Sequence, residues 1–529
     1  MKLEIGISMT DPTEKGTRRP LAPQRDAGIG GWATRRAITH PDVSALIYDG
    51  SHVTYRELLD RSTAVAHHLA GLGVCPGDRV AYAGRNEPAF VYTMLGTHLL
   101  GAIFVPLNFR LAPRELDYVL QHSEATVLIY APESAASVQE SVAAGELAKR
   151  QALVAVTDAA PDGSDFASWL ESGFQRYFDV PISRDDTAFI LYTSGTTGRP
   201  KGATLSHDNV YWNCLNLFAT LDITSREVAL VSSPLFHVAA LTQTLLPVLL
   251  KGATAVLMPA WDTEECFDLI QDHAITWMFG VPTMYAAMEQ SARWKNTNLS
   301  SLRLLTAAGA PIPPSIIASY QKRGFLFCQG YGLTETAPGA TFLEASASRR
   351  KVGSAGLALP FTQVRCVTKD GRDVLPGERG EILIKGPNVM KGYWNDTKAT
   401  KESFTDDGWF RSGDIAVTDD EGYIYIVDRL KDMFISGGEN IYPSEVEAAL
   451  YEHPAVQDAA VVGTPDEKWG EVGKAFISPA AGQHTSSQEL RQFLASRLAK
   501  YKIPVYFEFL DDLPKTGSGK VRKDILRER

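Results

Sequence analysis

The sequence predicts an α/β fold: a large N-terminal domain of layered βαβ sheets with a small β-barrel-like section, followed by a small α+β C-terminal domain. Three observations predict this. Short β-rich runs alternate with helical patterns from Ser44 to about residue 330, as in largely parallel sheets covered by helices. Near residue 360 the pattern changes to short strands joined by tight turns, which is typical of antiparallel hairpins. After Asp432 a compact βα pattern continues for about 100 residues, which is enough for a separate domain.

The alternating part begins with a strand and a helix that Thr54 caps, and Gly252 suits the end of a later helix. Parallel sheets of this kind bind ligands in crevices at the carboxyl ends of their strands. The expected strands are Ser44–Tyr48, Arg79–Ala83, Ile103–Pro106, Ala188–Tyr192, Glu227–Ser232, Thr254–Met258, Thr276–Phe279, Arg303–Ala307 and Phe325–Gln329, and the expected helices include Glu87–Leu100, one starting near Ser206, Val238–Leu250, Glu264–His273 and Pro314–Lys322.

The later part divides into two sections. Strands are expected at Phe361–Thr368, Gly380–Lys385, Ile415–Thr418 and Tyr423–Val427, and then at Asp458–Gly463, Lys474–Pro479 and Val505–Leu510, with helices at Ser444–His453 and Gln488–Ala499. The domain boundary is placed within Asp428–Asp432. The predicted organisation is therefore a flexible tail over residues 1–28, an N-terminal domain over 29–430 and a C-terminal domain over 431–529.

Composition excludes several classes of protein. The chain has 529 residues, and 52 Lys and Arg against 62 Asp and Glu give a net charge of −10, so nothing indicates nucleic-acid binding. Five cysteines without a CxxC pair argue against a disulfide scaffold or zinc ribbon and favour a reducing, cytoplasmic location. The apolar runs Phe90–Val105 and Leu235–Leu250 fall short of the about 20 residues that a membrane span needs.

The most informative segment, Leu191–Gly202, follows an apolar strand. Glycines let the backbone approach a ligand and direct N–H groups at it, hydroxyl groups add donors and the lysine adds charge, a combination that suits a polyphosphate. The alternative is a mobile surface loop. The spacing excludes a Walker A loop, because Lys201 follows Pro200 and precedes Gly202. The candidate residues are Thr193, Ser194, Gly195, Thr196, Thr197, Gly198 and Lys201.

A second segment, Gln329–Thr336, directly follows the strand Phe325–Cys328. Tyr331 offers a stacking face between two glycines, Thr334 offers a hydroxyl, and Glu335 offers a hard oxygen ligand for Mg²⁺. The alternative is a plain turn at the end of a strand.

Three further segments carry charged residues beside glycine. In Gly408–Asp414 the aspartate ends a strand, where a carboxylate can accept two hydrogen bonds from a ribose diol. Asp428–Asp432 leads into Ser436–Asn440, and the charged residues there are equally consistent with a solvated cluster. Pro514–Lys520 places a lysine on a glycine-flanked loop, for which the alternative is an ordinary charge in the tail of the chain.

Together and in this order, the five segments resemble the adenylate-forming superfamily of acyl-CoA synthetases, aryl-CoA ligases, luciferases and peptide-synthetase adenylation domains. The resemblance covers about residues 30–527. Within the superfamily, the sequence resembles feruloyl- and 4-coumarate-CoA ligases and bacterial fatty-acyl-CoA ligases most strongly. The short segments that support this are Val105–Asn108, Pro234–His237, Gly280–Tyr285 and Ile435–Val446.

The resemblance implies an ATP-dependent acid–thiol ligase that uses ATP, Mg²⁺ and CoA. Such enzymes convert a carboxylic acid to acyl-AMP with release of pyrophosphate, and then transfer the acyl group to CoA and release AMP. An aromatic acid (ferulate, coumarate or a benzoate) or a fatty acid is expected, and the enzyme is expected to be a monomer or a homodimer. The alternatives are the same fold with another acceptor (carrier-protein thiol, amine or nitrite nitrogen, or oxygen), a phosphotransferase releasing ADP, and a non-catalytic nucleotide-binding protein.

The resemblance also implies roles for particular residues. The segment from Thr193 to Lys201 would enclose the β- and γ-phosphates, Thr334 would touch the α-phosphate and Glu335 would bind Mg²⁺. Tyr331, within Gly330–Gly332, would lie against adenine beside Gly309, Ala310 and Pro311. Asp414 would hold the ribose, assisted by Arg429.

For catalysis, the resemblance implies that Lys520 lies between the carboxylate and the α-phosphate during adenylation. A mobile C-terminal domain would then rotate about a hinge at Lys431 for the thiol step. Gly437 and Gly438 would line the pantetheine tunnel, and Trp469 would contact the CoA adenine. The acyl pocket would be bordered by His237, Val281, Ala308, Gly309, Gly330 and Gly339, although His237 could equally be a packed core histidine.

Overall fold

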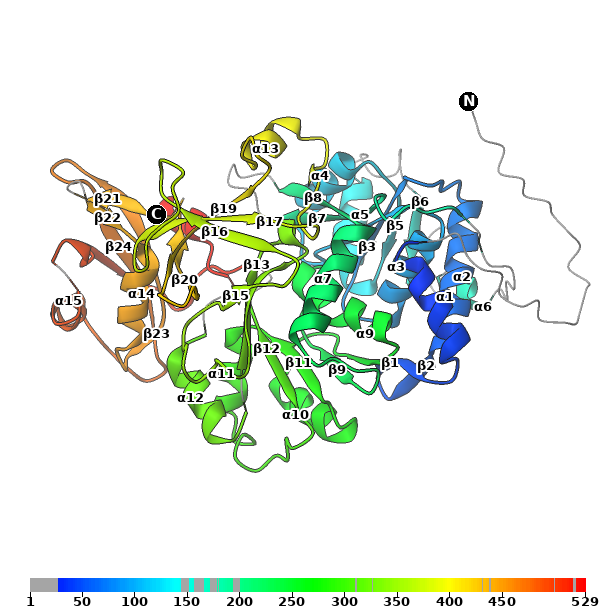
Figure 1. Ribbon diagram of the computed structural model, residues 1–529, viewed down its shortest axis with the longest axis horizontal. Helices are drawn as coiled ribbons and strands as arrows, with labels where there is room; N and C mark the ends of the chain where they lie inside the picture. Colours follow the sequence, from blue (N-terminus) through cyan, green and yellow to red (C-terminus); the bar gives the residue numbers. More distant parts are fainter. Residues whose placement is uncertain are drawn as a thin grey trace, which may run out of the picture.

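The computed structural model describes residues 27–143, 152–156, 166–171, 178, 180–193, 200–309, 312–325, 327–430, 432–436, 439–498, 500–516 and 520–529. It confirms the predicted α/β class, with two large sheets, a smaller antiparallel sheet and a C-terminal region with a sheet of its own (Figure 1). The predicted boundary falls on residue 431, outside the described residues, and stays a prediction.

The seven-stranded sheet carries the segment predicted to bind phosphate. Strands β3 to β7 are parallel to their neighbours, whereas β7 and β8 form an antiparallel hairpin, to which β18 adds antiparallel. The order is β18 (Gly392–Tyr393), β8 (Lys201–Ser206), β7 (Thr187–Thr193), β4 (Ile103–Leu107), β3 (Arg79–Ala83), β5 (Ala125–Tyr130) and β6 (Ala152–Ala155).

The nine-stranded sheet carries the Gln329–Thr336 segment. Its central strands are parallel, and antiparallel strands close both edges. The order is β15 (Leu357–Ala358), β14 (Gly339–Leu343), β13 (Phe327–Gly332), β12 (Leu304–Ala307), β11 (Trp277–Gly280), β9 (Val228–Val231), β10 (Thr254–Leu257), β1 (Ser44–Tyr48) and β2 (Ser51–Thr54).

Alternate strand residues enter different cores, which shows that both faces of each large sheet are covered. Val80 and Tyr82 of β3 pack into the largest core, whereas Ala81 and Ala83 face another. The largest core lies between the two sheets and contains residues of α1 (Gly30–Thr39), α2 (Tyr55–Gly71), α3 (Pro88–Leu99), α7 (His207–Thr220) and α9 (Leu246–Lys251). The outer faces are covered by α4 (Pro113–Ser123) and α5 (Ala135–Ala143) on one sheet, and by α10 (Thr263–Asp272), α11 (Pro282–Gln290) and α12 (Pro314–Lys322) on the other.

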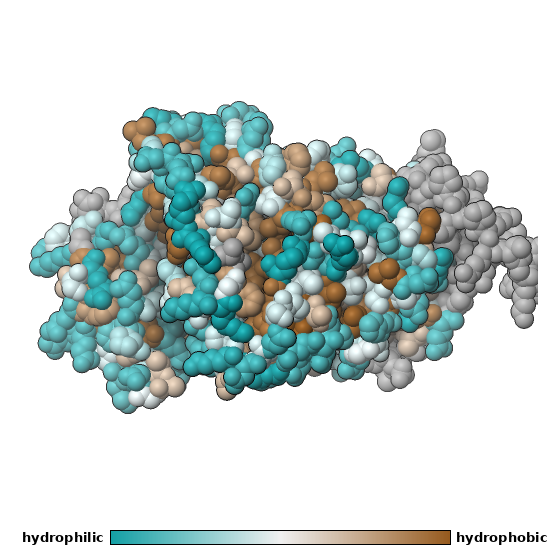
Figure 2. Space-filling view, turned by 60° about the horizontal axis from the view of Figure 1, so that its bottom comes forward, coloured by the Kyte–Doolittle hydropathy of each residue, from teal (hydrophilic) through white to brown (hydrophobic). Residues whose placement is uncertain are grey.

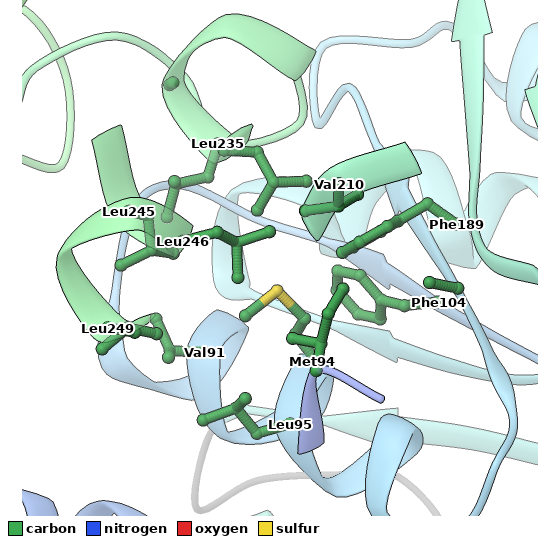
Figure 3. Packing of buried hydrophobic residues seen from close by; sticks show 14 of the residues in the cluster. Val91, Met94, Leu95, Phe104, Phe189, Val210, Leu235, Leu245, Leu246 and Leu249 are labelled. Carbon is green, nitrogen blue, oxygen red and sulfur yellow. The ribbon is translucent and has the colours of Figure 1, made fainter. Parts of the chain in front are cut away.

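The central core joins segments far apart in the chain. In Figure 3, Met94 of α3 points into a space between Leu246 of α9 and the rings of Phe104 and Phe189, which come from neighbouring strands. All four side chains are at least 98 % buried. Burial of large apolar side chains at close packing is what fixes the two sheets relative to each other.

The remaining elements form the hairpin-rich section, the C-terminal region and short connections. The antiparallel sheet is β16 (Gln363–Val367), β17 (Arg379–Lys385), β19 (Phe410–Thr418) and β20 (Ile424–Arg429). The C-terminal region contains β21 (Phe434–Ser436), β22 (Glu439–Ile441), α14 (Pro443–Tyr451), β23 (Val456–Asp466), β24 (Gly470–Pro479), α15 (Ser487–Ala495), η5 (Lys500–Lys502), β25 (Tyr506–Phe509) and α16 (Lys523–Arg527). The short elements are η1 (Pro132–Ser134), α6 (Phe166–Glu171), α8 (Val238–Ala240), η3 (Leu241–Leu245), η4 (Thr334–Thr336) and α13 (Thr397–Glu402).

One local expectation was wrong and another is confirmed with a difference in detail. The phosphate segment does not lead straight from a strand into a helix, because β8 returns antiparallel to β7 before α7 begins. The expected helix Val238–Leu250 is present as a continuous helical run made of α8, a π-helical turn at η3, and α9. An apolar run in the sequence predicts that a helix is buried, but it does not reveal where the spacing of the backbone hydrogen bonds changes.

The C-terminal region contacts the antiparallel sheet through polar groups. The Arg379 guanidinium of β17 lies 3.2 Å from the Glu445 carboxylate and 4.2 Å from the Tyr442 ring centroid. Ser444 donates its backbone N–H to Asp428 Oδ2 at 2.8 Å, so an acidic side chain of β20 caps the start of α14. Lys502 also pairs with Glu445. These contacts fix the orientation in which the region carries its lysine loop.

Within the described residues, no helix combines the length and the apolar character needed to cross a membrane. On the face shown in Figure 2, hydrophobic residues lie in patches interspersed with hydrophilic ones.

Candidate functional site

Asp414 is the centre of a buried polar cluster. It lies on β19 opposite Arg429 of β20, and the Arg429 Nε is 2.9 Å from Asp414 Oδ1. The Tyr331 hydroxyl, from β13 of the other sheet, donates to Asp414 Oδ2 at 2.7 Å. Burial raises the pKa of Asp414, while Arg429, Tyr331 and the nearby Lys520 act in the opposite direction. The sequence-predicted adenine and ribose residues therefore meet at one carboxylate.

We expect Asp414→Asn to raise the KM for ATP by about 10- to 100-fold, because a hydrogen bond to a charged group contributes about 1.5–3 kcal/mol. The KM for the acid should change little. Initial rates at varied ATP test this. Asp419→Asn is the control, because Asp419 follows β19 at its far end and pairs with Lys351 at 2.6 Å. Equal effects in both variants would contradict a ligand-binding role for Asp414.

Glu335 is a buried carboxylate suited to a metal ion. It lies on η4 immediately after β13, is 8 % exposed, and accepts a hydrogen bond from the Tyr393 hydroxyl at Oε1 over 2.7 Å. No Lys or Arg forms an ion pair with it in the described ranges. A hard, negatively charged oxygen donor without an ion-pair partner in the described ranges fits Mg²⁺, and the cation that it influences, Arg429, pairs with Asp414 instead. Tyr393 was not among the residues predicted from sequence.

The phosphate segment is described only at its ends. Thr193 and Lys201 stand opposite each other where the β7–β8 hairpin opens, and Ser194, Gly195, Thr196, Thr197 and Gly198 lie outside the described residues. The Lys201 ammonium lies 5.2 Å from the Tyr393 ring centroid. Strand β8 also contacts η4, so the lysine and the candidate metal carboxylate are brought to the same place.

Lys520 lies at this site although it comes from the C-terminal region. Its positive charge is close enough to lower the pKa of both Asp414 and His237. The loop is held by hydrogen bonds from Thr516 N to Lys520 O at 2.7 Å and from Lys520 N to Thr516 Oγ1 at 3.2 Å. Nearby, Lys515 pairs with Asp458 at 2.6 Å. The charge of Lys520 therefore acts on both Asp414 and His237.

His237 is one of the residues predicted to border the acyl pocket, and its imidazole lies in a shielded environment. Burial, followed by the charges of Lys520 and Arg110, lowers the pKa of His237 to about 4, so the imidazole is neutral at pH 7. Its Nε2 is shielded from solvent and has no hydrogen-bond partner among the described residues. Gly309 has a φ of +92°, and a Cβ there would lie 3.6 Å from Val281 Cγ1. Ala308 precedes it, partly buried.

Sequence reasoning missed Gln243, whose side chain lies close to the predicted pocket residue Gly330. A Cβ on Gly330 would lie 3.7 Å from Gln243 Nε2, and the buried Gln329 Nε2 has no partner among the described residues. A Cβ on Gly339 would instead lie 2.6 Å from Leu359 Cδ1 in the core, so Gly339 can border a pocket only through its backbone. Gly332 allows no side chain, since a Cβ would stand 1.5 Å from the Pro338 oxygen.

The remaining predicted residues differ in how far the structure describes them. Trp469 is exposed on the turn between β23 and β24, where the Lys468 ammonium lies 4.7 Å from its ring centroid. Thr334 stands next to Glu335 on η4. Ala310, Pro311, Lys431, Gly437 and Gly438 lie outside the described residues.

Comparison with known proteins gives two family matches: AMP-binding enzyme over residues 33–394 and AMP-binding enzyme C-terminal domain over 445–520. A feruloyl-CoA synthase of Amycolatopsis sp is 48 % identical over 505 residues, covering 96 % of this chain and 99 % of the relative. A long-chain-fatty-acid–CoA ligase of Mycobacterium tuberculosis is 38 % identical over 503 residues, covering 94 % and 98 %.

Solved structures of related enzymes support the same family. The O-succinylbenzoate coenzyme A synthetase of Bacillus subtilis, in complex with ATP and magnesium ion, is 34 % identical, with a TM-score of 0.83 and coverage of 94 % and 98 %. The chain therefore belongs to the AMP-binding enzyme family, as an AMP-forming acyl-CoA synthetase that uses ATP, Mg²⁺ and CoA.

Proposed function

We propose that this enzyme forms the CoA thioester of an aromatic acid with polar ring substituents, of the ferulate type. The similarity to a feruloyl-CoA synthase over nearly the full chain carries the proposal. The candidate pocket supports it, because the shielded polar groups of His237 and Gln243 would face only apolar atoms if the pocket held a fatty acyl chain. A hydroxyl or methoxy group on a ring offers these groups a partner.

The residue roles in the first step are also proposed. The acid's carboxylate attacks the α-phosphorus of ATP, and pyrophosphate leaves. Two anions must approach, so cations and donors are needed where charge accumulates. Lys520 would lie against the carboxylate and α-phosphate, Lys201 against the outer phosphates, and Thr334 would donate to the α-phosphate. Mg²⁺, held by Glu335, would neutralise phosphate charge.

The second step needs the same carbon to be open to a thiol. We propose that the C-terminal domain rotates about Lys431 and removes Lys520. Gly437 and Gly438 would then line the route of the pantetheine arm, and Trp469 would meet the CoA adenine. The exposed ring of Trp469 is available for such stacking.

The experiment is a pyrophosphate-release screen over ferulate, coumarate, benzoates and fatty acids of six to eighteen carbons, with and without CoA. We expect the highest kcat/KM with hydroxylated or methoxylated aromatic acids, and AMP and acyl-CoA as products. Preference for a fatty acid would overturn the aromatic assignment and leave the ligase activity standing. Acyl-AMP that turns over only with a carrier protein would instead favour a non-CoA acceptor.

We propose a cytoplasmic enzyme, monomeric or homodimeric. All five cysteines are free thiols, and four of them are buried, as suits a reducing compartment.

A further inference from the structure

Tyr393 links the candidate metal carboxylate to the phosphate-segment lysine. Its hydroxyl donates to Glu335 Oε1 at 2.7 Å, and its ring centroid lies 5.2 Å from Lys201 Nζ. Opposite charges thus lie on two sides of one aromatic side chain, and no ion pair between Lys201 and Glu335 is present in the described part of the chain. The proposed reaction steps give Tyr393 no role.

Hydrogen bonds hold the backbone around Tyr393 to both β8 and η4. Gly392 and Tyr393 pair with Thr204 and Ala203 of β8, and Trp394 N donates to Gly202 O at 2.7 Å. On the other side, Met390 N donates to Glu335 O at 2.8 Å. Main-chain bonds therefore hold the backbone that carries Tyr393 between β8 and η4.

The same segment fixes the turn that carries Glu335. Asn388, which is fully buried, donates through Nδ2 to Thr336 O at 2.7 Å and to Gly339 O at 2.6 Å. A tyrosine held so firmly can direct a carboxylate, because neither partner can move far to relieve the hydrogen bond.

We propose that Tyr393 is a positioning residue with two functions, both resting on the proposed roles of Glu335 and Lys201. Its hydroxyl orients the Glu335 carboxylate through one oxygen and leaves the other for Mg²⁺. As a neutral donor it preserves the negative charge, which an arginine or lysine in its place would neutralise.

The second function is that of a spacer. A lysine and a buried carboxylate close to each other form an ion pair unless something separates them. The Tyr393 ring attracts the Lys201 ammonium to its face and keeps it from Glu335. Each charge then stays available for its own ligand, Mg²⁺ for the carboxylate and phosphate for the lysine.

Two variants separate these functions. Tyr393→Phe keeps the ring and removes the hydroxyl, so we expect the Mg²⁺ concentration for half-maximal stabilisation to rise about tenfold, the usual loss when a partner of a metal ligand is removed. Binding of Mg-free ATP should be unchanged. Tyr393→Leu removes the ring as well, so Lys201 pairs with Glu335 and both Mg²⁺ and Mg-free ATP binding weaken.

The readout is thermal unfolding of the full chain titrated with Mg²⁺ in the presence of a non-hydrolysable ATP analogue, with Mn²⁺ binding by electron paramagnetic resonance as a second measurement. Isothermal titration measures Mg-free ATP binding. Tyr451→Phe is the matched control, because Tyr451 also donates to a carboxylate, Asp458 Oδ1 at 2.5 Å, within the C-terminal region.

Glu335→Gln separates this inference from the proposed function. A Mg²⁺ midpoint unchanged in Glu335→Gln would overturn the metal role of Glu335. A midpoint shifted in Glu335→Gln but unchanged in Tyr393→Phe would overturn only the positioning role of Tyr393. A loss of thermal stability without a shifted midpoint would make Tyr393 merely structural and would also overturn the inference.

Discussion

Lys520→Ala lowers the rate of acyl-AMP formation by about 100- to 1000-fold, the effect expected when one preorganised charge donor is removed from a transition state. Thioester formation from supplied acyl-AMP should largely survive, because the thiol step does not need this ammonium. The charge of Lys520 already acts on Asp414 and His237 in the structure, as expected if the proposed nucleotide and acid sites both lie within its reach.

The two half-reactions are measured separately, by acid-dependent pyrophosphate exchange and by CoA-dependent consumption of acyl-AMP. Lys515→Ala is the control, since Lys515 lies on the same loop but pairs with Asp458. If both half-reactions of Lys520→Ala fell by the same factor, the assigned role in adenylation would be wrong.

Lys431→Pro should produce the opposite pattern. Proline fixes φ near −65° and costs about 3 kcal/mol where the backbone needs another conformation, which corresponds to about 100-fold in rate. If the hinge must change its dihedral angles only for the thiol step, adenylation survives and thioester formation falls by that amount.

Lys431→Ala distinguishes the backbone from the side chain. It removes the charge while leaving φ free, and we expect both half-reactions to persist. Unchanged thioester formation in Lys431→Pro, under conditions in which acyl-AMP still forms, would place the hinge elsewhere.

Sequence alone predicted the parts of this site that are local. Tyr331 follows the mostly apolar run Phe325–Cys328, so its place near the end of a strand could be read from neighbouring residues. Asp414 was expected at the end of a strand, but it lies in the middle of β19, because the strand begins at Phe410 and pairs with β20 on both sides of the aspartate. The five motifs then identified the superfamily, and the family matches confirm it.

What could not be predicted depends on pairing between distant segments. Strand β18 has two residues and exists only because it pairs with β8, for example through Thr204 Oγ1 donating to Gly392 O over 188 positions in the chain. Tyr393 and Glu335 are 58 positions apart. No composition or periodicity marks such a partner, because a single tyrosine beside a glycine also occurs in ordinary turns.

The contacts between the C-terminal region and the antiparallel sheet have a thermodynamic consequence. Arg379 and Glu445 retain 38 % and 29 % of their side-chain exposure, and the neighbouring contact of Ser444 with Asp428 is also polar. Separating such groups uncovers little apolar surface, so these contacts should add little to the heat-capacity change of the proposed domain rotation. The equilibrium between the two domain orientations should respond instead to ionic strength, because salt screens the interactions between exposed charges. The screening length is about 10 Å at 0.1 M salt.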